Sequence, residues 1–155
     1  MSEPPAVQLK VISSLTAVAA TDWDACANPD SQICNPFLRH AFLLALEESG
    51  SAVSETGWLG QHLVLEDADG TVHAVMPLYL KNHSQGEYIF DYGWADAFHR
   101  AGGNYYPKLL SAVPFTPAVL CLYRPPSVRQ RRRWYHGRLL VEGSATCTRN
   151  YRSYS

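Results

Sequence analysis

The stretch that decides the fold is HLVLEDADGTVHAVMPLYL, residues 62–80. Residues 62–66 and 71–80 are both β-prone runs. The four residues between them have the composition of a tight turn, in which Gly70 supplies a positive φ. The stretch therefore predicts an antiparallel hairpin. Because proline cannot donate to the hydrogen-bond ladder, Pro77 predicts an edge, a bulge or a bend in the return strand.

Short elements are predicted on the N-terminal side of the hairpin. Residues 7–12 alternate in polarity, which indicates a strand. A short helix should follow, with Thr21 or Asp22 as its N-cap ahead of Trp23.

A longer helix is predicted over residues 36–48. Asn35 is a good N-cap, a proline fits the first helical position, and apolar residues repeat at helical spacing until Gly50 ends the run. This placement leaves Glu47 and Glu48 in solvent.

On the C-terminal side, residues 88–90 predict a further strand and residues 91–100 a helix. The sequence Ala-Gly-Gly at 101–103 should end that helix, and residues 108–113 predict a last strand. The resulting order of β, α, α, β, β, β, α, β predicts an α/β (α+β) fold. We expect a mixed sheet with helices packed on it, rather than a bundle or a barrel.

The composition is that of a folded domain. The chain has 155 residues, of which 46% are hydrophobic and 12% aromatic. That length suits one packed domain. The N-terminus lacks the basic and apolar regions of a signal peptide, and no run approaches the ~20 apolar residues that cross a bilayer. We expect a soluble, cytoplasmic protein without a membrane span.

The charge changes sign along the chain. Residues 1–117 hold 5 basic and 13 acidic side chains, whereas residues 118–155 hold 8 arginines and one acid. The near-neutral total of −1 thus averages two unlike segments.

The cysteines predict no metal site. Cys26, Cys34, Cys121 and Cys147 show neither C-x-x-C spacing nor nearby histidines placed as zinc ligands. We interpret them as buried or incidental thiols.

Polar and aromatic side chains gather between Pro77 and Pro117, as a binding groove requires. The candidate proton-transfer residues are His83 and Asp91. The alternative interpretation is a polar turn with a surface histidine. The candidate substrate-binding residues are Lys81, Ser84, Tyr88, Trp94, Tyr105, Tyr106 and Lys108. Of these, the tyrosines at 105 and 106 would line a groove and Lys108 would neutralise a phosphate or carboxylate, although core packing is the alternative for the aromatic pair.

Four blocks carry a family resemblance. They are NPFLRHAFLLALEESG (35–50), TGWLGQHLVLEDADG (56–70), PLYLKNHSQGEYIFDYGWADAF (77–98) and GGNYYPKLLSAVPFTP (102–117). Together they resemble the FemAB-like group of GNAT-fold proteins, which is linked to peptidoglycan biosynthesis or recognition. The resemblance covers roughly residues 5–117 and implies the N-terminal part of an acyltransferase-like domain, with a mixed, curved sheet flanked by helices.

The resemblance also implies a chemistry. Fem relatives acylate amines from an aminoacyl-tRNA donor, and GNAT enzymes do so from an acyl-CoA. No glycine-rich turn entering a helix, which would hold a pyrophosphate, is present here, so no cofactor is predicted from a motif. The implied acceptor is an amine of a cell-wall precursor or a similar small molecule.

The matching blocks end at Pro117, where the charge changes sign. We interpret residues 118–155 as an irregular basic tail from a shifted reading frame and not as part of the fold. The alternative is a functional basic arm, in which arginines beside Trp134 and Tyr135 bind nucleic acid. Because a partial fold leaves a sheet edge and an apolar face uncovered, we also expect self-association.

The main hypothesis is therefore a truncated acyltransferase that acts on an amine. A non-catalytic recognition module is the first alternative. Nucleic-acid binding, through the tail or a tRNA donor, is the second.

Overall fold

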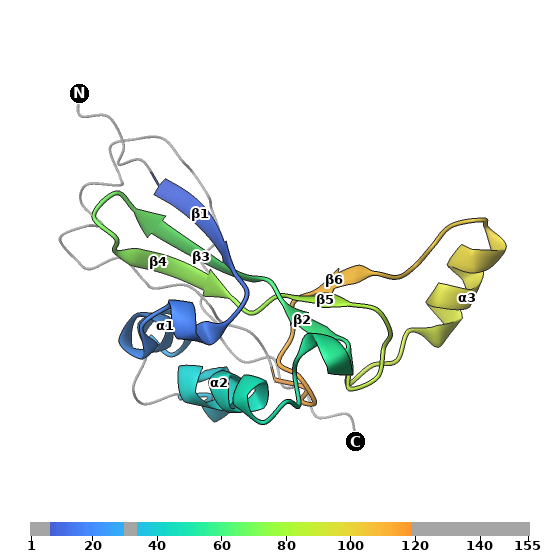
Figure 1. Cartoon of the computed structure of the whole chain (residues 1–155), viewed down its shortest axis with the longest axis horizontal. Helices are drawn as coiled ribbons and strands as arrows, with labels where there is room; N and C mark the ends of the chain where they lie inside the picture. Colours follow the sequence, from blue (N-terminus) through green and yellow to red (C-terminus); the bar gives the residue numbers. More distant parts are fainter. Residues whose placement is uncertain (1–6, 30–33, 119–155) are drawn as a thin grey trace, which may run out of the picture. The chain divides into compact units, whose positions relative to one another are not determined.

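A computed structural model describes residues 7–29 and 34–118 of the chain (Figure 1). Contacts divide the chain into two units, residues 1–125 and 126–155, and every described residue belongs to the first. Most of the Arg-rich segment, from residue 119 onward, lies outside the described residues, as do the hypotheses about it.

The described residues confirm the α+β class. Their elements in chain order are β1 (Val7–Ile12), the 3-10 turn η1 (Leu15–Ala17), α1 (Ala20–Ala27), η2 (Pro36–Leu38), α2 (His40–Glu48), η3 (Ser54–Thr56), β2 (Trp58–Gly60), β3 (His62–Asp67), β4 (Val72–Met76), β5 (Tyr79–Lys81), α3 (Tyr92–Arg100) and β6 (Lys108–Leu110). Within these ranges, no helix has the length and apolar character needed to cross a bilayer.

The strands form two small sheets where one mixed sheet was expected. The first has the order β1-β3-β4 and the second β2-β5-β6, and every pairing is antiparallel. The predicted hairpin is confirmed as β3 and β4, with Gly70 at φ 80° in the turn. The bend predicted at Pro77 is also confirmed, since β4 ends at Met76 and the chain enters the second sheet at Tyr79.

Three strand predictions need correction. Residues 88–90 form no strand, and their side chains are 57–78% exposed. The strand predicted over 108–113 ends at Leu110. The sequence prediction also missed β2, a three-residue strand too short to show a period of two.

The helix starts also differ from the predictions. Helix α1 is preceded by Ala19 as N-cap, so Thr21 and Asp22 lie inside its first turn. The helix predicted over 36–48 is divided in two. Asn35 does cap the first part by accepting from the Phe37 N–H at 3.1 Å, but that part is a single 3-10 turn.

The division occurs at Arg39, which has an extended backbone with ψ 141°. Helix α2 then begins at His40, whose N–H donates to Asp24 Oδ1 at 2.8 Å. A side chain from α1 thus satisfies one of the free donors at the start of α2. The predicted end is confirmed, because α2 stops at Glu48 and Gly50 has φ 72°.

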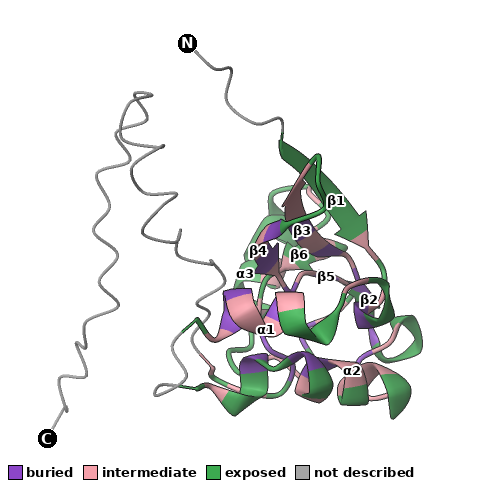
Figure 2. Cartoon of the chain, turned by 90° about the vertical axis from the view of Figure 1, so that its left-hand side faces the viewer, coloured by how far each residue is buried: buried purple, intermediate pink, exposed green. Residues whose placement is uncertain are grey.

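Among the described residues, the buried apolar side chains form two clusters. Figure 2 shows the buried residues in purple. In the larger cluster, helix α1 packs on β4, and buried side chains of α1, α2, β3 and β4 meet around Trp23. The Trp23 Nε1–H donates to the Leu38 carbonyl at 3.0 Å, which satisfies the buried indole. The smaller cluster centres on Trp58 and Tyr79 in the second sheet. Cys26 is buried, and its Sγ lies 3.9 Å from the Val72 carbonyl oxygen, while Cys34 is exposed.

Glu47 was expected in solvent, and this prediction is wrong. Its carboxylate accepts hydrogen bonds from Ser14 Oγ at 2.8 Å, the Leu15 N–H at 3.1 Å and His62 Nε2 at 3.1 Å. His62 Nδ1 accepts from the Leu78 N–H at 3.3 Å, so its Nε2 carries the proton that is donated to Glu47. The carboxylate therefore joins α2 to the end of β1 and to β3.

These bonds set the protonation of Glu47. Burial alone would raise the pKa of the carboxyl, but hydrogen bonds from the three donors outweigh it and hold the pKa below its ordinary value.

Replacing Glu47 with glutamine should lower the free energy of unfolding by about 1–3 kcal/mol, because an amide cannot accept from all three donors. Urea denaturation at neutral pH measures the change. The matched control is Glu48→Gln, an exposed neighbour on the same helix, which should stay within about 0.5 kcal/mol of the wild type.

The effect should also depend on pH. Because the pKa of Glu47 is lowered by folding, its stabilisation is present above the unfolded pKa and is lost as the pH falls through the folded one. The difference in unfolding free energy between the wild type and Glu47→Gln should therefore become smaller at acidic pH. Equal losses of unfolding free energy in Glu47→Gln and Glu48→Gln at neutral pH would contradict the role of Glu47 in joining α2 to the two strands.

Candidate functional site

The candidate site forms where β5 and β6 pair. In this register Lys81 lies directly opposite Lys108, so two cations meet on one face of the sheet. Like charges placed opposite each other repel. The connection after β5 supplies two carboxylates, Glu87 and Asp91, that offset this repulsion.

Asp91 is the centre of the site. The Tyr105 hydroxyl donates to its Oδ2 at 2.7 Å, the Tyr106 hydroxyl donates to its Oδ1 at 2.9 Å, and Lys108 Nζ forms an ion pair with it. Burial alone would raise the pKa of Asp91, but these donors outweigh it and lower the pKa well below its usual range. The carboxyl therefore stays ionised even in mild acid.

Lys108 is shared between two carboxylates. Besides the pair with Asp91, its Nζ lies 2.7 Å from Glu87 Oε2. Burial opposes the charged form, yet the two acceptors raise the pKa of Lys108 above its ordinary value.

Lys81 is fully buried. Its Nζ donates to the Gln85 carbonyl at 2.9 Å and lies 3.6 Å from the centroid of the Trp58 ring, in cation–π geometry. Burial lowers the pKa of Lys81 to about 8, and the attraction of Glu87 only partly opposes the shift. The Lys81 amine therefore loses its proton at a pH closer to 7 than an ordinary lysine does.

A pair of hydroxyl groups meets at Asp91. Ser84 is buried, and its Oγ lies 2.6 Å from the Tyr106 hydroxyl. The Tyr106 hydroxyl donates to Asp91. Ser84 also hydrogen-bonds the Asp91 carboxyl and helps to lower its pKa.

Glu87 belongs to this site although the sequence did not single it out. Its side chain is only 6% exposed, and its Oε1 has no hydrogen-bond partner among the described residues. Glu87 lies in the polar run 81–88, so the sequence shows a carboxylate in this region. The carboxylate turns inward because Lys81 and Lys108 face each other, and that pairing depends on strand register, which composition does not reveal.

A glycine contact fixes this connection. Gly86 has φ 78°, and a Cβ there would lie 2.6 Å from the Phe115 ring and 3.0 Å from Trp58 Nε1. The Phe115 N–H donates to the Gly86 carbonyl at 3.1 Å. Only glycine fits between the two rings.

Six of the nine predicted site residues come together here: Lys81, Ser84, Asp91, Tyr105, Tyr106 and Lys108. The other three lie elsewhere. His83 lies over Gly57 and accepts from the Gln85 N–H at 3.2 Å. Tyr88 and Trp94 are exposed to 68% and 75%.

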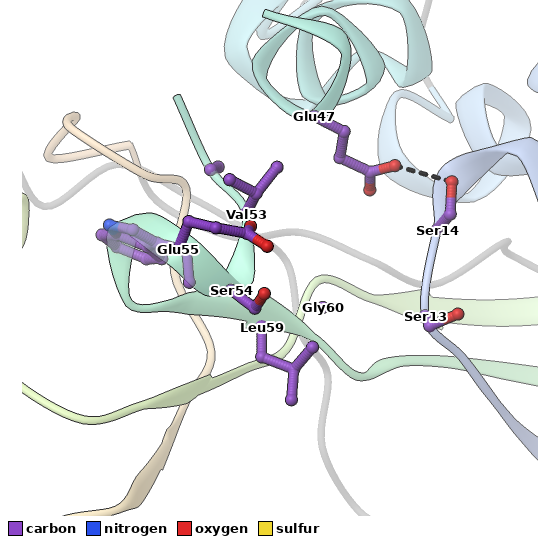
Figure 3. Close-up of a pocket in the computed structure, with 10 residues that line it drawn as sticks. Ser13, Ser14, Glu47, Val53, Ser54, Glu55, Leu59 and Gly60 are labelled. Carbon is purple, nitrogen blue, oxygen red and sulfur yellow. Dashed lines mark hydrogen bonds between the residues drawn. The ribbon is translucent and has the colours of Figure 1, made fainter. Parts of the chain in front are cut away.

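A separate open pocket of about 230 Å³ lies near the end of β1 (Figure 3). Glu47 and Trp58 contribute to its wall, together with Ser13, Ser14, Ala52, Val53, Ser54, Glu55, Leu59 and Gly60. None of the predicted site residues lines it. The Glu47 carboxylate already accepts a hydrogen bond from Ser14 Oγ, so we assign it a structural role.

Lys81 should make stability depend on pH. Between pH about 8 and about 10.4, the unfolded chain binds a proton at this side chain that the folded chain has released. The free energy of unfolding should therefore rise across that range.

Denaturation at a series of pH values measures the rise. Lys81→Met should remove it, whereas Lys10→Met, at an exposed lysine of β1, should leave it in place. The same pH dependence in Lys81→Met as in the wild type would contradict the assignment.

Comparison with known proteins gives one match. Residues 14–134 match the FemAB-like family, described by its role in peptidoglycan biosynthesis or recognition. The matched region is well over half of the chain and continues past Pro117 into the Arg-rich segment. No curated protein and no solved structure matches the chain. The chain belongs to the FemAB-like family, and its role is related to peptidoglycan.

Proposed function

We propose that the chain takes part in acylating a primary amine of a cell-wall precursor, and that Asp91 binds this amine. The observation that supports the proposal is the Asp91 group: a carboxylate with a lowered pKa between two tyrosine hydroxyls and a lysine. A carboxylate that is ionised at neutral pH attracts an ammonium group, and the tyrosine rings offer contact area around it.

Asp91 was predicted to transfer protons, but its lowered pKa suits binding better. A carboxyl that stays ionised in acid is a weak base, so it suits binding and orientation better than proton removal. His83 stays a candidate proton acceptor, although it lies against Gly57. An acyl-CoA or an aminoacyl-tRNA is the proposed donor, by resemblance to GNAT and Fem enzymes.

A recognition module is the second candidate. The family description includes recognition, and the Asp91 group has the features of a binding site without a base at its centre. In this case the same residues would hold the precursor's amine and transfer nothing.

Binding to Asp91 can be tested with precursor peptides that carry a free primary amine. Asp91→Asn should weaken binding about 10- to 100-fold, the value of a charge-assisted hydrogen bond. The matched control is Asp96→Asn on α3, the helix that follows Asp91, where the carboxylate is exposed and pairs with Arg100. Calorimetry gives both affinities. Equal losses in the two variants, or undiminished binding of the N-acetylated peptide, would contradict the proposed contact.

Transfer is tested separately. The chain is incubated with the peptide and either an acyl-CoA or an aminoacyl-tRNA, and the peptide mass is followed. An added acyl mass that disappears in Asp91→Asn supports the transferase. Binding that depends on Asp91 without any mass change supports the recognition module.

A further inference from the structure

One stretch of the chain exposes an unusual amount of aromatic surface. We define the α3 surface as Tyr88, Ile89, Phe90, Tyr92, Trp94 and Phe98. Each of these side chains is 50–78% exposed, and the rings of Phe90 and Tyr92 stack at 5.5 Å. Exposed aromatic residues gathered in one segment are typical of an interaction site.

Among the described residues, few hold helix α3 in place. It spans nine residues, and none of them is buried. Its side-chain contacts include Phe98, which meets the Tyr105 ring at 6.1 Å and covers Gly103. Isolated helices of this length are marginal in water, and helices in proteins depend on packing one face against a partner. A second surface that covers helix α3 should therefore stabilise it.

The charge near this surface favours one class of partner. Asp96 and Arg100 pair at 2.7 Å within α3, and Asp91 pairs with Lys108 at its start. Formal charges at Lys81, Glu87, Asp91, Asp96, Arg100 and Lys108 cancel. Nucleic acids and anionic bilayers both attract surfaces with excess positive charge. A neutral aromatic surface lacks that attraction and does not repel a copy of itself.

The area agrees with such a contact. A buried aromatic residue removes about 150–250 Å² from water, so five aromatics at these exposures offer about 600 Å². Ile89 adds to this area. A stable interface needs about 800 Å² on each partner. We propose that the α3 surface is the contact through which two copies of this chain associate. This inference does not rest on the proposed function, since none of the side chains of the α3 surface belongs to the Asp91 group.

Sedimentation at increasing concentrations of the full chain tests the proposal. The wild type should pass from monomer to dimer. Trp94→Ser combined with Phe90→Ser should weaken the dimer about 30-fold or more, as expected for aromatic residues at the centre of an interface. Both side chains are more than half exposed, so the fold should tolerate their replacement.

The matched control is Leu9→Ser. Leu9 is a 59% exposed apolar residue on β1, in the first sheet. This variant should leave the dimer unchanged. A wild type that stays monomeric at all concentrations would overturn the proposal. So would a dimer that the α3 variant leaves intact, or one that Leu9→Ser weakens equally.

Hydrogen exchange of the wild type gives a second measurement that needs no variant. Amides of residues 92–100 should gain protection as the concentration rises, while those of β3 should not. Protection of α3 that does not change with concentration would also overturn the proposal, even in a chain that dimerises.

Discussion

Proline at position 77 has no N–H to donate, and this constraint separates the two sheets. The chain leaves the first sheet after Met76, and within three residues it begins β5. The carbonyl of Pro77 accepts from Ser111 Oγ at 3.0 Å, and that of Leu78 accepts from the Gln61 N–H at 2.8 Å. Residues on both sides of the bend are thus held by other segments, and the second sheet is built from there.

Aromatic rings connect the two sheets into one interior. Trp23 from α1 meets His62 of β3 edge-on at 6.1 Å, His62 meets Tyr79 of β5 at 4.9 Å, and Tyr79 meets Trp58 of β2 at 5.1 Å. Trp58 also contacts Lys81 and Phe115. The same indole therefore belongs to the core and borders the candidate site. A change in packing at His62 can therefore reach the buried Lys81 amine through Tyr79 and Trp58.

The sequence predicted local structure well where a single residue decides it. Gly70, Pro77 and Gly50 each act through backbone geometry, and each acts as predicted. Asn35 caps through its side-chain oxygen, but only a single 3-10 turn. Predictions failed where a distant partner decides. Arg39 interrupts a helix because Asp24 caps the next one, and Glu47 turns inward because Ser14 and His62 meet it there. The aromatic run at 88–90 has strand propensity but no neighbouring strand to pair with among the described residues.

The site shows the same division. Its polar and aromatic residue types were visible in the run from Lys81 to Lys108, and pairing of β5 with β6 brings most of them together. Glu87 was missed and His83 lies apart from the lysines, because only the path of the connection decides which side chains turn toward them. Residue type identified the region, and strand register selected its members.

The contact between Gly86 and Phe115 has a consequence for the order of folding. The connection that carries Glu87 and Asp91 is held by a residue 29 positions further along the chain. During synthesis, the two carboxylates emerge well before this ring does, and β6 emerges only slightly earlier than the ring. Contacts between distant residues form late because loop closure must come first. The first sheet can form while the candidate site is still open, so the site is among the last parts of the chain to acquire its charges in their final arrangement.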